Sequence, residues 1–165
     1  TDALTGLFNR RAFQAAVDET LLKRIAGVFI FIDVDNFKNY NDKYGHANGD
    51  LCLKHFAATM KKCFPKDSIL GRYGGDEFVV YIKNAASDDA HRYMDEFQRE
   101  ISHLMMSGGE HVTVSASAGG VAFIGEGEDF VSLCRSADNM LYDVKRNGKG
   151  TFKIKGAKTV SYTHL

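Results

Sequence analysis

The sequence lacks an excess of charge of either sign. Its 165 residues include 21 Lys plus Arg and 21 Asp plus Glu, so the formal net charge is zero with neutral histidines. A domain that binds nucleic acid along the phosphate backbone normally carries a basic surplus. We therefore expect no general nucleic-acid binding.

Paired cysteines and long apolar runs are also missing. Cys52, Cys63 and Cys134 form no Cys-x-x-Cys pair, and an odd count is typical of thiols in a reducing compartment rather than of a disulfide framework. No apolar run approaches the roughly 18 residues of a membrane span, and no secretory signal is recognisable. At this length we expect a single cytoplasmic domain without direct membrane contact.

Two adjacent carboxylates behind a glycine pair are the most informative feature that is present. Asp76 and Glu77 follow Gly74 and Gly75, and apolar stretches on either side predict a hairpin over residues 69–82. Glycine adopts positive φ without strain and lets a ligand approach the backbone closely. An ordinary turn with solvated acids would have the same local pattern, so a functional interpretation needs a second acidic segment.

That second segment is an apolar run over 28–32 that ends in Asp33 and Asp35. Its β-branched and aromatic residues predict a strand buried on both faces, with the two acids on the same side of its end. Beside the hairpin, the strand would gather three or four carboxylates, an arrangement that is stable mainly around a cation. All-oxygen ligation suits Mg²⁺ or Mn²⁺ together with substrate phosphates, which predicts phosphoryl or nucleotidyl transfer.

The remaining patterns predict a mixed α and β domain. Apolar residues recur at helical spacing over 130–147, and Gly148 ends that helix. Residues 156–165 have little periodicity, so we expect a frayed or appended tail after a domain that spans 1–155. The expected elements are helix 10–25, strand 28–33, short helix 37–43, helix 50–63, hairpin 69–82, helix 87–106, strand 112–123, helix 130–147 and strand 151–154.

Several motifs, in order, resemble those of the GGDEF domain, the diguanylate cyclase family. They are DALTGLFNRR at 2–11, DVDNFK at 33–38 and GGDEF at 74–78, and the resemblance extends to about residue 154. It implies an α+β, palm-like nucleotide-cyclase fold: a central five-stranded, mainly antiparallel sheet flanked by helices, with the GGDEF motif on a β-hairpin. Further matching residues are Asn41, Asp42, Gly45, His46, Gly49, Asp50, Ala137, Asp138, Tyr142 and Lys145.

The resemblance implies that Asp33, the backbone carbonyl of Val34, Asp76 and Glu77 hold Mg²⁺ or Mn²⁺. Glu77 is either a second-metal ligand or a group that deprotonates the attacking hydroxyl. Asp76 has also been cast as the proton acceptor, and the sequence does not divide these roles. Lys38 is expected to stabilise the charge that grows on phosphate as pyrophosphate leaves.

Asp35 fits a structural acid or a helix cap better than a metal ligand, because a new element starts directly behind it. Backbone N–H groups of Asn36 and Phe37 suit the terminal phosphates of a nucleotide. Lys145 and Lys149 suit them too, although a solvated basic helix end is the alternative. The family commonly has Arg where this chain has Lys149, which predicts weaker triphosphate affinity.

Asn41 and Asp50 are the candidates for base recognition. A carboxylate accepts hydrogen bonds from both N1–H and the 2-amine of guanine, whereas adenine has an acceptor at N1 and no 2-amine. His46 either contacts the nucleotide or orders its loop. The Arg-x-x-Asp inhibitory product site of many relatives is missing, since its positions here run from Pro65 to Ser68.

The resemblance thus implies a diguanylate cyclase that condenses two GTP into cyclic di-GMP and two pyrophosphates across a homodimer. An upstream sensor or dimerisation domain is expected, which would allow a membrane anchor in the full-length parent protein. A catalytically silent GTP-binding regulatory or interaction module is the alternative. A cyclase that makes a mixed cyclic dinucleotide is a third reading, which Asp50 disfavours.

Overall fold

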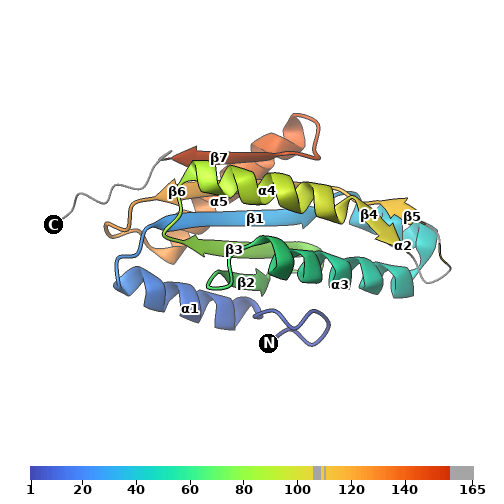
Figure 1. The fold of residues 1–165 in the computed structure, drawn as a ribbon, viewed down its shortest axis with the longest axis horizontal. Helices are drawn as coiled ribbons and strands as arrows, with labels where there is room; N and C mark the ends of the chain where they lie inside the picture. The colour runs from blue at the N-terminus through green and yellow to red at the C-terminus, as the bar shows by residue number, and fades with distance from the viewer. Residues whose placement is uncertain (106–108, 110, 157–165) are drawn as a thin grey trace.

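The computed structural model describes residues 1–105, 109 and 111–156. Its centre is a five-stranded sheet with strand order β2-β3-β1-β6-β7 (Figure 1). β1 pairs antiparallel with both β3 and β6, β2 pairs antiparallel with β3, and β7 runs parallel to β6. These strands are β1 (Gly27–Val34), β2 (Ile69–Arg72), β3 (Glu77–Lys83), β6 (Ala116–Phe123) and β7 (Phe152–Gly156).

Helices cover both faces of this sheet, and a small two-stranded sheet lies beside it. The α+β prediction, with a mainly antiparallel five-stranded sheet, is therefore confirmed. The helices are α1 (Arg10–Leu22), α2 (Phe37–Tyr44), α3 (His46–Cys63), α4 (Ser87–Ile101) and α5 (Phe130–Arg146), and the small sheet pairs β4 (His103–Met105) with β5 (His111–Thr113).

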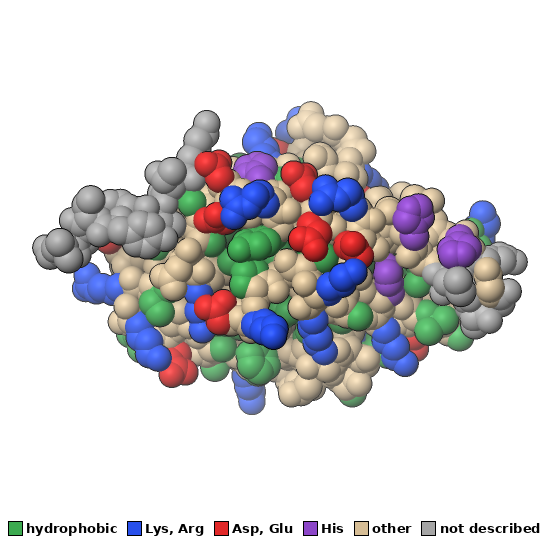
Figure 2. Space-filling model, viewed as in Figure 1, with side chains coloured by type: hydrophobic (Ala, Val, Ile, Leu, Met, Phe, Trp, Pro, Cys, Tyr) green, Lys and Arg blue, Asp and Glu red, His purple; other side chains and the backbone are tan. Residues whose placement is uncertain are grey.

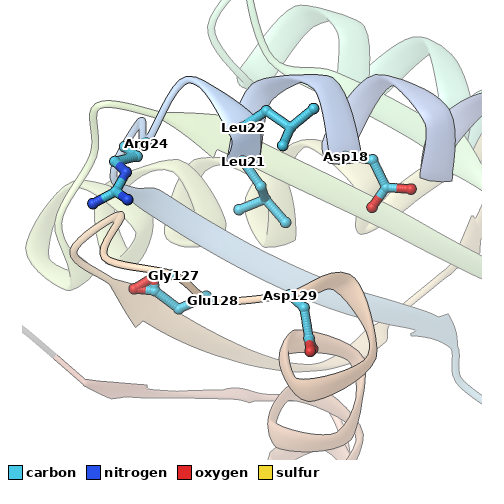
Figure 3. A pocket seen from close by; sticks show the side chains of 7 residues that line it. All are labelled: Asp18, Leu21, Leu22, Arg24, Gly127, Glu128 and Asp129. Carbon is cyan, nitrogen blue, oxygen red and sulfur yellow. The ribbon is translucent and has the colours of Figure 1, made fainter.

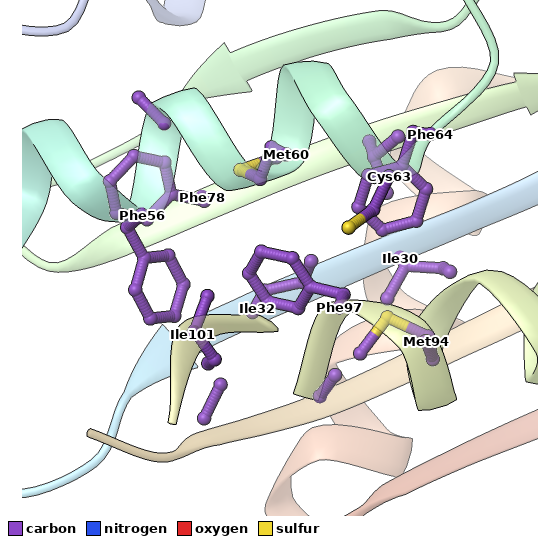
Figure 4. Close-up of a cluster of buried hydrophobic side chains, with 14 of the residues drawn as sticks. Ile30, Ile32, Phe56, Met60, Cys63, Phe64, Phe78, Met94, Phe97 and Ile101 are labelled. Carbon is purple, nitrogen blue, oxygen red and sulfur yellow. The ribbon is translucent and has the colours of Figure 1, made fainter. Parts of the chain in front are cut away.

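β1 is buried along its whole length because both of its faces are covered. Its even-numbered residues, such as Ile30 and Ile32, pack with α3 and α4 in the larger core (Figure 4). Its odd-numbered residues, such as Phe29 and Phe31, pack with α1 and α5 in a second, aromatic-rich core. The period of two places Asp33 on the α5 side of the sheet, where it meets the last turn of that helix.

Some predicted boundaries are wrong. The helix expected over 10–25 ends at Leu22, and the helix expected from residue 50 already begins at His46. The helix expected over 87–106 ends at Ile101 and gives way to β4; Met106 lies outside the described residues. Gly156, expected in a frayed tail, is the last residue of β7, whereas 157–165 lie outside the described residues.

The strand expected over 112–123 is two strands that serve different sheets. The Val114 N–H donates to the Ser102 carbonyl at 3.1 Å, next to the β4–β5 pair. From Ala116 onward the chain pairs with β1 instead, with Ala116 opposite Val34. The backbone therefore changes partners between these positions, which the alternating pattern of the segment does not reveal.

The outer surface has mixed charge. Acidic and basic side chains are interspersed over the face that carries α3 and α4, in keeping with the balanced composition (Figure 2). Among the helices of the described residues, none combines the length and the apolar character that a membrane crossing requires.

Candidate active site

A cavity of about 310 Å³ lies at the carboxyl end of β1. At this end of the strand the chain turns into α2 (Figure 1). Three separate parts of the chain contribute to it: the β1–α2 junction, the turn before β3, and the end of α5 with its following loop. Most of the residues assigned to metal and phosphate binding are thereby brought together. The lining residues are Asp33, Val34, Asp35, Asn36, Phe37, Lys38, Asn39, Asp76, Lys145 and Lys149.

Asp33 is the most buried acid of the cavity, with 8% of its surface exposed. One carboxylate oxygen, Oδ2, accepts a hydrogen bond from the Lys145 ammonium, and the other, Oδ1, is buried without a partner among the described residues. Burial raises the pKa of Asp33, with a smaller rise from the charges of Glu77 and Asp76, although Lys145 opposes it. Lys145 alone does not offset the cost of burying the Asp33 carboxylate, so a further cation would stabilise its charged form.

Glu77 lies directly opposite Asp33 in the antiparallel register of β1 and β3, but it is exposed and does not line the cavity. Within the described ranges, no group of three or more His, Cys, Asp or Glu side chains is placed to hold a metal ion. The expected gathering of three or four carboxylates is therefore not present there. Three acids, Asp33, Asp35 and Asp76, line the cavity together with Val34, and the Asp35 carboxylate is already hydrogen-bonded to two serines. That oxygen set fits Mg²⁺, which commonly takes its other ligands from water and phosphates.

The first turn of α2 offers backbone donors to this cavity. Asn36, the residue before the helix, has left-handed dihedrals (φ 54°, ψ 35°) and its side chain does not cap the helix. Free N–H groups at a helix start favour an anion. The Asn36 side-chain oxygen instead accepts a hydrogen bond from Lys149 Nζ at 3.3 Å.

Asp35 is a structural acid, one of the two roles predicted for it. Its carboxylate oxygens accept hydrogen bonds from Ser115 Oγ at 2.7 Å and from Ser117 Oγ at 2.6 Å. The helix-cap alternative is wrong, because Asn36 occupies the cap position of α2.

The predicted base-recognition residues do not line this cavity. Asn41 is on α2, while His46 and Asp50 are on α3, so all three lie on the elements that follow it. Asn41 Oδ1 is buried and has no partner among the described residues. A Cβ atom at Gly49 would lie 1.7 Å from this oxygen, so the Asn41 side chain fits only because residue 49 is glycine.

Arg72 links the hairpin turn to the N-terminal segment, a feature that sequence reasoning missed. Its guanidinium donates to the carbonyls of Gly74 and Gly75 at 2.8 to 3.2 Å and to the Asp2 carboxylate at 3.2 Å. Asp2 also accepts hydrogen bonds from the backbone N–H and hydroxyl of Thr5. An arginine two residues before the glycine pair was the available signal.

The pKa of Asp2 makes this link dependent on pH. Burial alone would raise that pKa, but the hydrogen bonds from Thr5 and the Arg72 guanidinium outweigh it and hold the pKa below its ordinary value. Asp2 therefore stabilises the fold above the ordinary carboxyl pKa, and this contribution is lost as pH falls through the lowered pKa. We expect Asp2→Asn to lower the free energy of unfolding by about 1–2 kcal/mol at pH 7.

Denaturant titrations of both proteins at several pH values check this expectation. The difference between wild type and Asp2→Asn should begin to shrink below about pH 4, where the Asp2 carboxyl of the unfolded chain becomes protonated, and should vanish below the lowered pKa of the folded state. A difference that stays constant down to pH 2.5 would show that the charge of Asp2 is not what matters.

A second cavity, of about 420 Å³, lies between the end of α1 and the loop before α5 (Figure 3). Two of its acids already have structural partners. Glu128 accepts hydrogen bonds from the backbone N–H groups of Gly125 and Glu126, and Asp129 caps α5 through the Ser132 N–H. The cavity is at the start of β1 rather than at its carboxyl end, so it is separate from the Asp33 site.

Comparison with known proteins shows the family of the chain. The family model described as diguanylate cyclase, GGDEF domain, matches residues 1–151. The chain is 33% identical over 152 residues to the diguanylate cyclase DgcM of Escherichia coli K12, covering 90% of this chain and 36% of that protein. It is also 33% identical over 157 residues to the cyclic di-GMP phosphodiesterase PdeR of the same organism, covering 93% and 24%. The chain thus spans only about a quarter to a third of these relatives.

Solved structures give the same result. The GGDEF domain of TpbB (YfiN) from Pseudomonas aeruginosa superposes with a TM-score of 0.87 at 30% identity, covering 94% of each chain. An active GGEEF domain of a diguanylate cyclase from Vibrio cholerae superposes with a TM-score of 0.77 at 29% identity, covering 90% and 97%. The chain therefore belongs to the family of diguanylate cyclase GGDEF domains.

Proposed function

We propose that the domain is a diguanylate cyclase that joins two GTP molecules, one bound to each of two copies, into cyclic di-GMP. The observation that carries this proposal is the cavity beside the start of α2, which Asp33 and Asp76 line together with Lys38, Lys145 and Lys149. Acids for a divalent cation, three ammonium groups and helical N–H donors are together what a magnesium–triphosphate needs.

In the proposed reaction the 3′-hydroxyl oxygen of one GTP attacks the α-phosphorus of the other. The new O3′–Pα bond forms, the bond from Pα to the bridging oxygen breaks, and pyrophosphate leaves with the bonding electrons. The hydroxyl proton passes to Glu77 or Asp76. Two such steps close the ring, so each copy supplies half of the reaction centre and the dimer supplies proximity.

Asp33, the Val34 carbonyl and Asp76, with Glu77 as a further ligand, would hold Mg²⁺ or Mn²⁺. Bound there, the ion would supply charge neutralisation of phosphate oxygens and a lower pKa for the attacking hydroxyl. Lys145, which pairs with Asp33 in this structure, would then be released to the phosphates. Lys38 stabilises the charge on the leaving group.

Asn41 and Asp50 are proposed to select guanine, with His46 beside them at the start of α3. Asn41 Oδ1, which is buried without a partner among the described residues, supports this assignment, because a polar atom in that state gains most from a ligand donor. Unmet hydrogen bonds would disfavour adenine.

The test is chromatographic: the purified domain is incubated with GTP and Mg²⁺ over a range of protein concentrations, and the nucleotide products are identified. Cyclic di-GMP whose rate rises more steeply than the protein concentration supports a cyclase that acts as a dimer. Absence of product, even when dimerisation is enforced by a fused leucine zipper, would overturn the proposal.

A silent GTP-binding module is the second candidate, and one observation favours it. PdeR, a protein named as a phosphodiesterase, has a segment that is 33% identical to this chain. A segment similar to this chain therefore occurs in a protein that is named for the breakdown of cyclic di-GMP and not for its synthesis. Tight GTP binding without turnover in the zipper-fused dimer would identify this case.

We also propose that cyclic di-GMP does not inhibit the domain through the hairpin-proximal product site. Pro65 and Ser68 stand where that site needs Arg and Asp, so the bidentate guanidinium contact to a guanine or phosphate cannot form. We expect the initial rate to stay unchanged when cyclic di-GMP is added at up to about 100 times the concentration of GTP-binding sites in the assay. Submicromolar inhibition that disappears in Lys66→Ala or Asp67→Ala would contradict this prediction.

A further inference from the structure

The loop that carries Lys149 follows α5 and has an unusual backbone. Gly148, Lys149 and Gly150 have φ values of 114°, 61° and 70°, three consecutive residues in the left-handed region. Lysine has no intrinsic preference for this region, so contacts with the rest of the fold must hold the loop in place. The Lys149 N–H is held by the Val144 carbonyl at 3.1 Å.

A buried serine holds the other end of this loop. The Gly150 N–H donates to Ser117 Oγ at 3.0 Å, and the Ser117 hydroxyl donates in turn to Asp35 Oδ1 at 2.6 Å. Ser117 has no exposed surface. Because its only proton goes to Asp35, the oxygen lone pairs of Ser117 remain oriented toward Gly150.

These bonds form a relay from the β1–α2 junction to the loop after α5. Asp35 lies one residue before Asn36, and Lys149 lies one residue before Gly150. The relay therefore holds the two segments whose side chains meet in the Lys149–Asn36 hydrogen bond. Both of these residues line the cavity that contains Asp33.

We propose that Ser117 and Asp35 are positioning residues that hold the Lys149 ammonium over the nucleotide triphosphate. The inference rests on the proposed function, since it assigns Lys149 to the triphosphate. External positioning matters more for a lysine than for an arginine at this place. A lysine makes a single point-charge contact, whereas the planar fork of an arginine fixes its own geometry. The relay supplies the geometry that the side chain lacks.

The test is a double-mutant cycle between Ser117→Ala and Lys149→Ala, read as KM and kcat for GTP and as binding of guanosine 5′-[α-thio]triphosphate with Mg²⁺. We expect Ser117→Ala to raise KM roughly five- to tenfold with kcat changed less than twofold, the pattern of a lost binding contact. In the Lys149→Ala background the same change should have almost no effect.

Ser115→Ala is the matched control, because the Ser115 hydroxyl also donates to Asp35 but, among the described residues, has no hydrogen bond to the loop. It should raise KM much less than Ser117→Ala does. Equal effects of the two alanine variants, or an undiminished effect of Ser117→Ala without Lys149, would overturn the relay. Asp35→Asn provides a second variant if Ser117→Ala unfolds, with the same expected coupling to Lys149.

A measurement without nucleotide separates this inference from the proposed function. The Gly150 amide should exchange with solvent slowly in wild type and at least about tenfold faster in Ser117→Ala, with the β6 amides unchanged. Rapid exchange of the Gly150 amide in wild type would overturn the relay, independently of any activity that is measured. Slow exchange with no binding of the thio analogue would instead remove the proposed GTP site.

Discussion

Glu77→Gln and Asp76→Asn are each expected to reduce the rate of cyclic di-GMP formation at least about 100-fold. Both changes keep the shape of the side chain and remove the negative charge. A neutral amide neither accepts the hydroxyl proton nor neutralises a divalent cation, and loss of a general base or a metal ligand commonly costs 10²–10⁴ in rate. The measurement is the initial rate at saturating GTP and Mg²⁺.

Asp67→Asn is the control, since Asp67 is also an exposed acid on the segment leading into the hairpin but does not line the cavity. Its rate should stay within twofold of wild type. Thermal unfolding midpoints of all three variants should match wild type, because neither Asp76 nor Glu77 is buried. Turnover retained in both hairpin variants would remove the proposed carboxylate roles.

Gly119→Ala is expected to lower the free energy of unfolding by about 3 kcal/mol, near the upper end of what overpacking costs. Gly119 is on β6, where α5 crosses the sheet. An added Cβ would lie 2.0 Å from the Leu141 nitrogen and 2.6 Å from its Cα. These are backbone atoms of α5, so the helix itself must shift rather than a flexible side chain.

Gly75→Ala is the matched comparison, because a Cβ at that position meets nothing within 4 Å. Its free energy of unfolding should change by less than about 0.5 kcal/mol. Denaturant titration of both variants measures the contrast. Equal stabilities would mean that α5 does not pack on β6 as closely as the structure has it.

The sequence patterns that predicted structure most reliably are those with one physical cause. β1 is apolar from Val28 to Ile32 because both of its faces are buried, and α5 has a helical apolar period because only one of its faces is. The acids of Asp33 and Asp76 stand out because charge at the end of a buried strand or in a hairpin turn has no packing role. The fold class and most of the cavity lining were predictable for these reasons.

The features that sequence reasoning missed either leave no local pattern or depend on pairs of residues far apart in the chain. β4 has three residues, too few for an alternating pattern, and the end of α4 at Ile101 carries no glycine or proline signal. The Asp33–Lys145 pair spans 112 positions and the Asp35–Ser117 bond spans 82. A serine inside a strand reads as ordinary until the structure identifies its partner.

The central position of β1 has a consequence for how the chain is made. β1 leaves the ribosome well before β3 and long before β6, yet its backbone hydrogen bonds need both. Until residue 123 has been synthesised, the most apolar strand of the protein has at least one open edge, which is the condition for pairing with other chains. We therefore expect folding to be slow and late during translation, and fragments that stop before β6 to accumulate as aggregates.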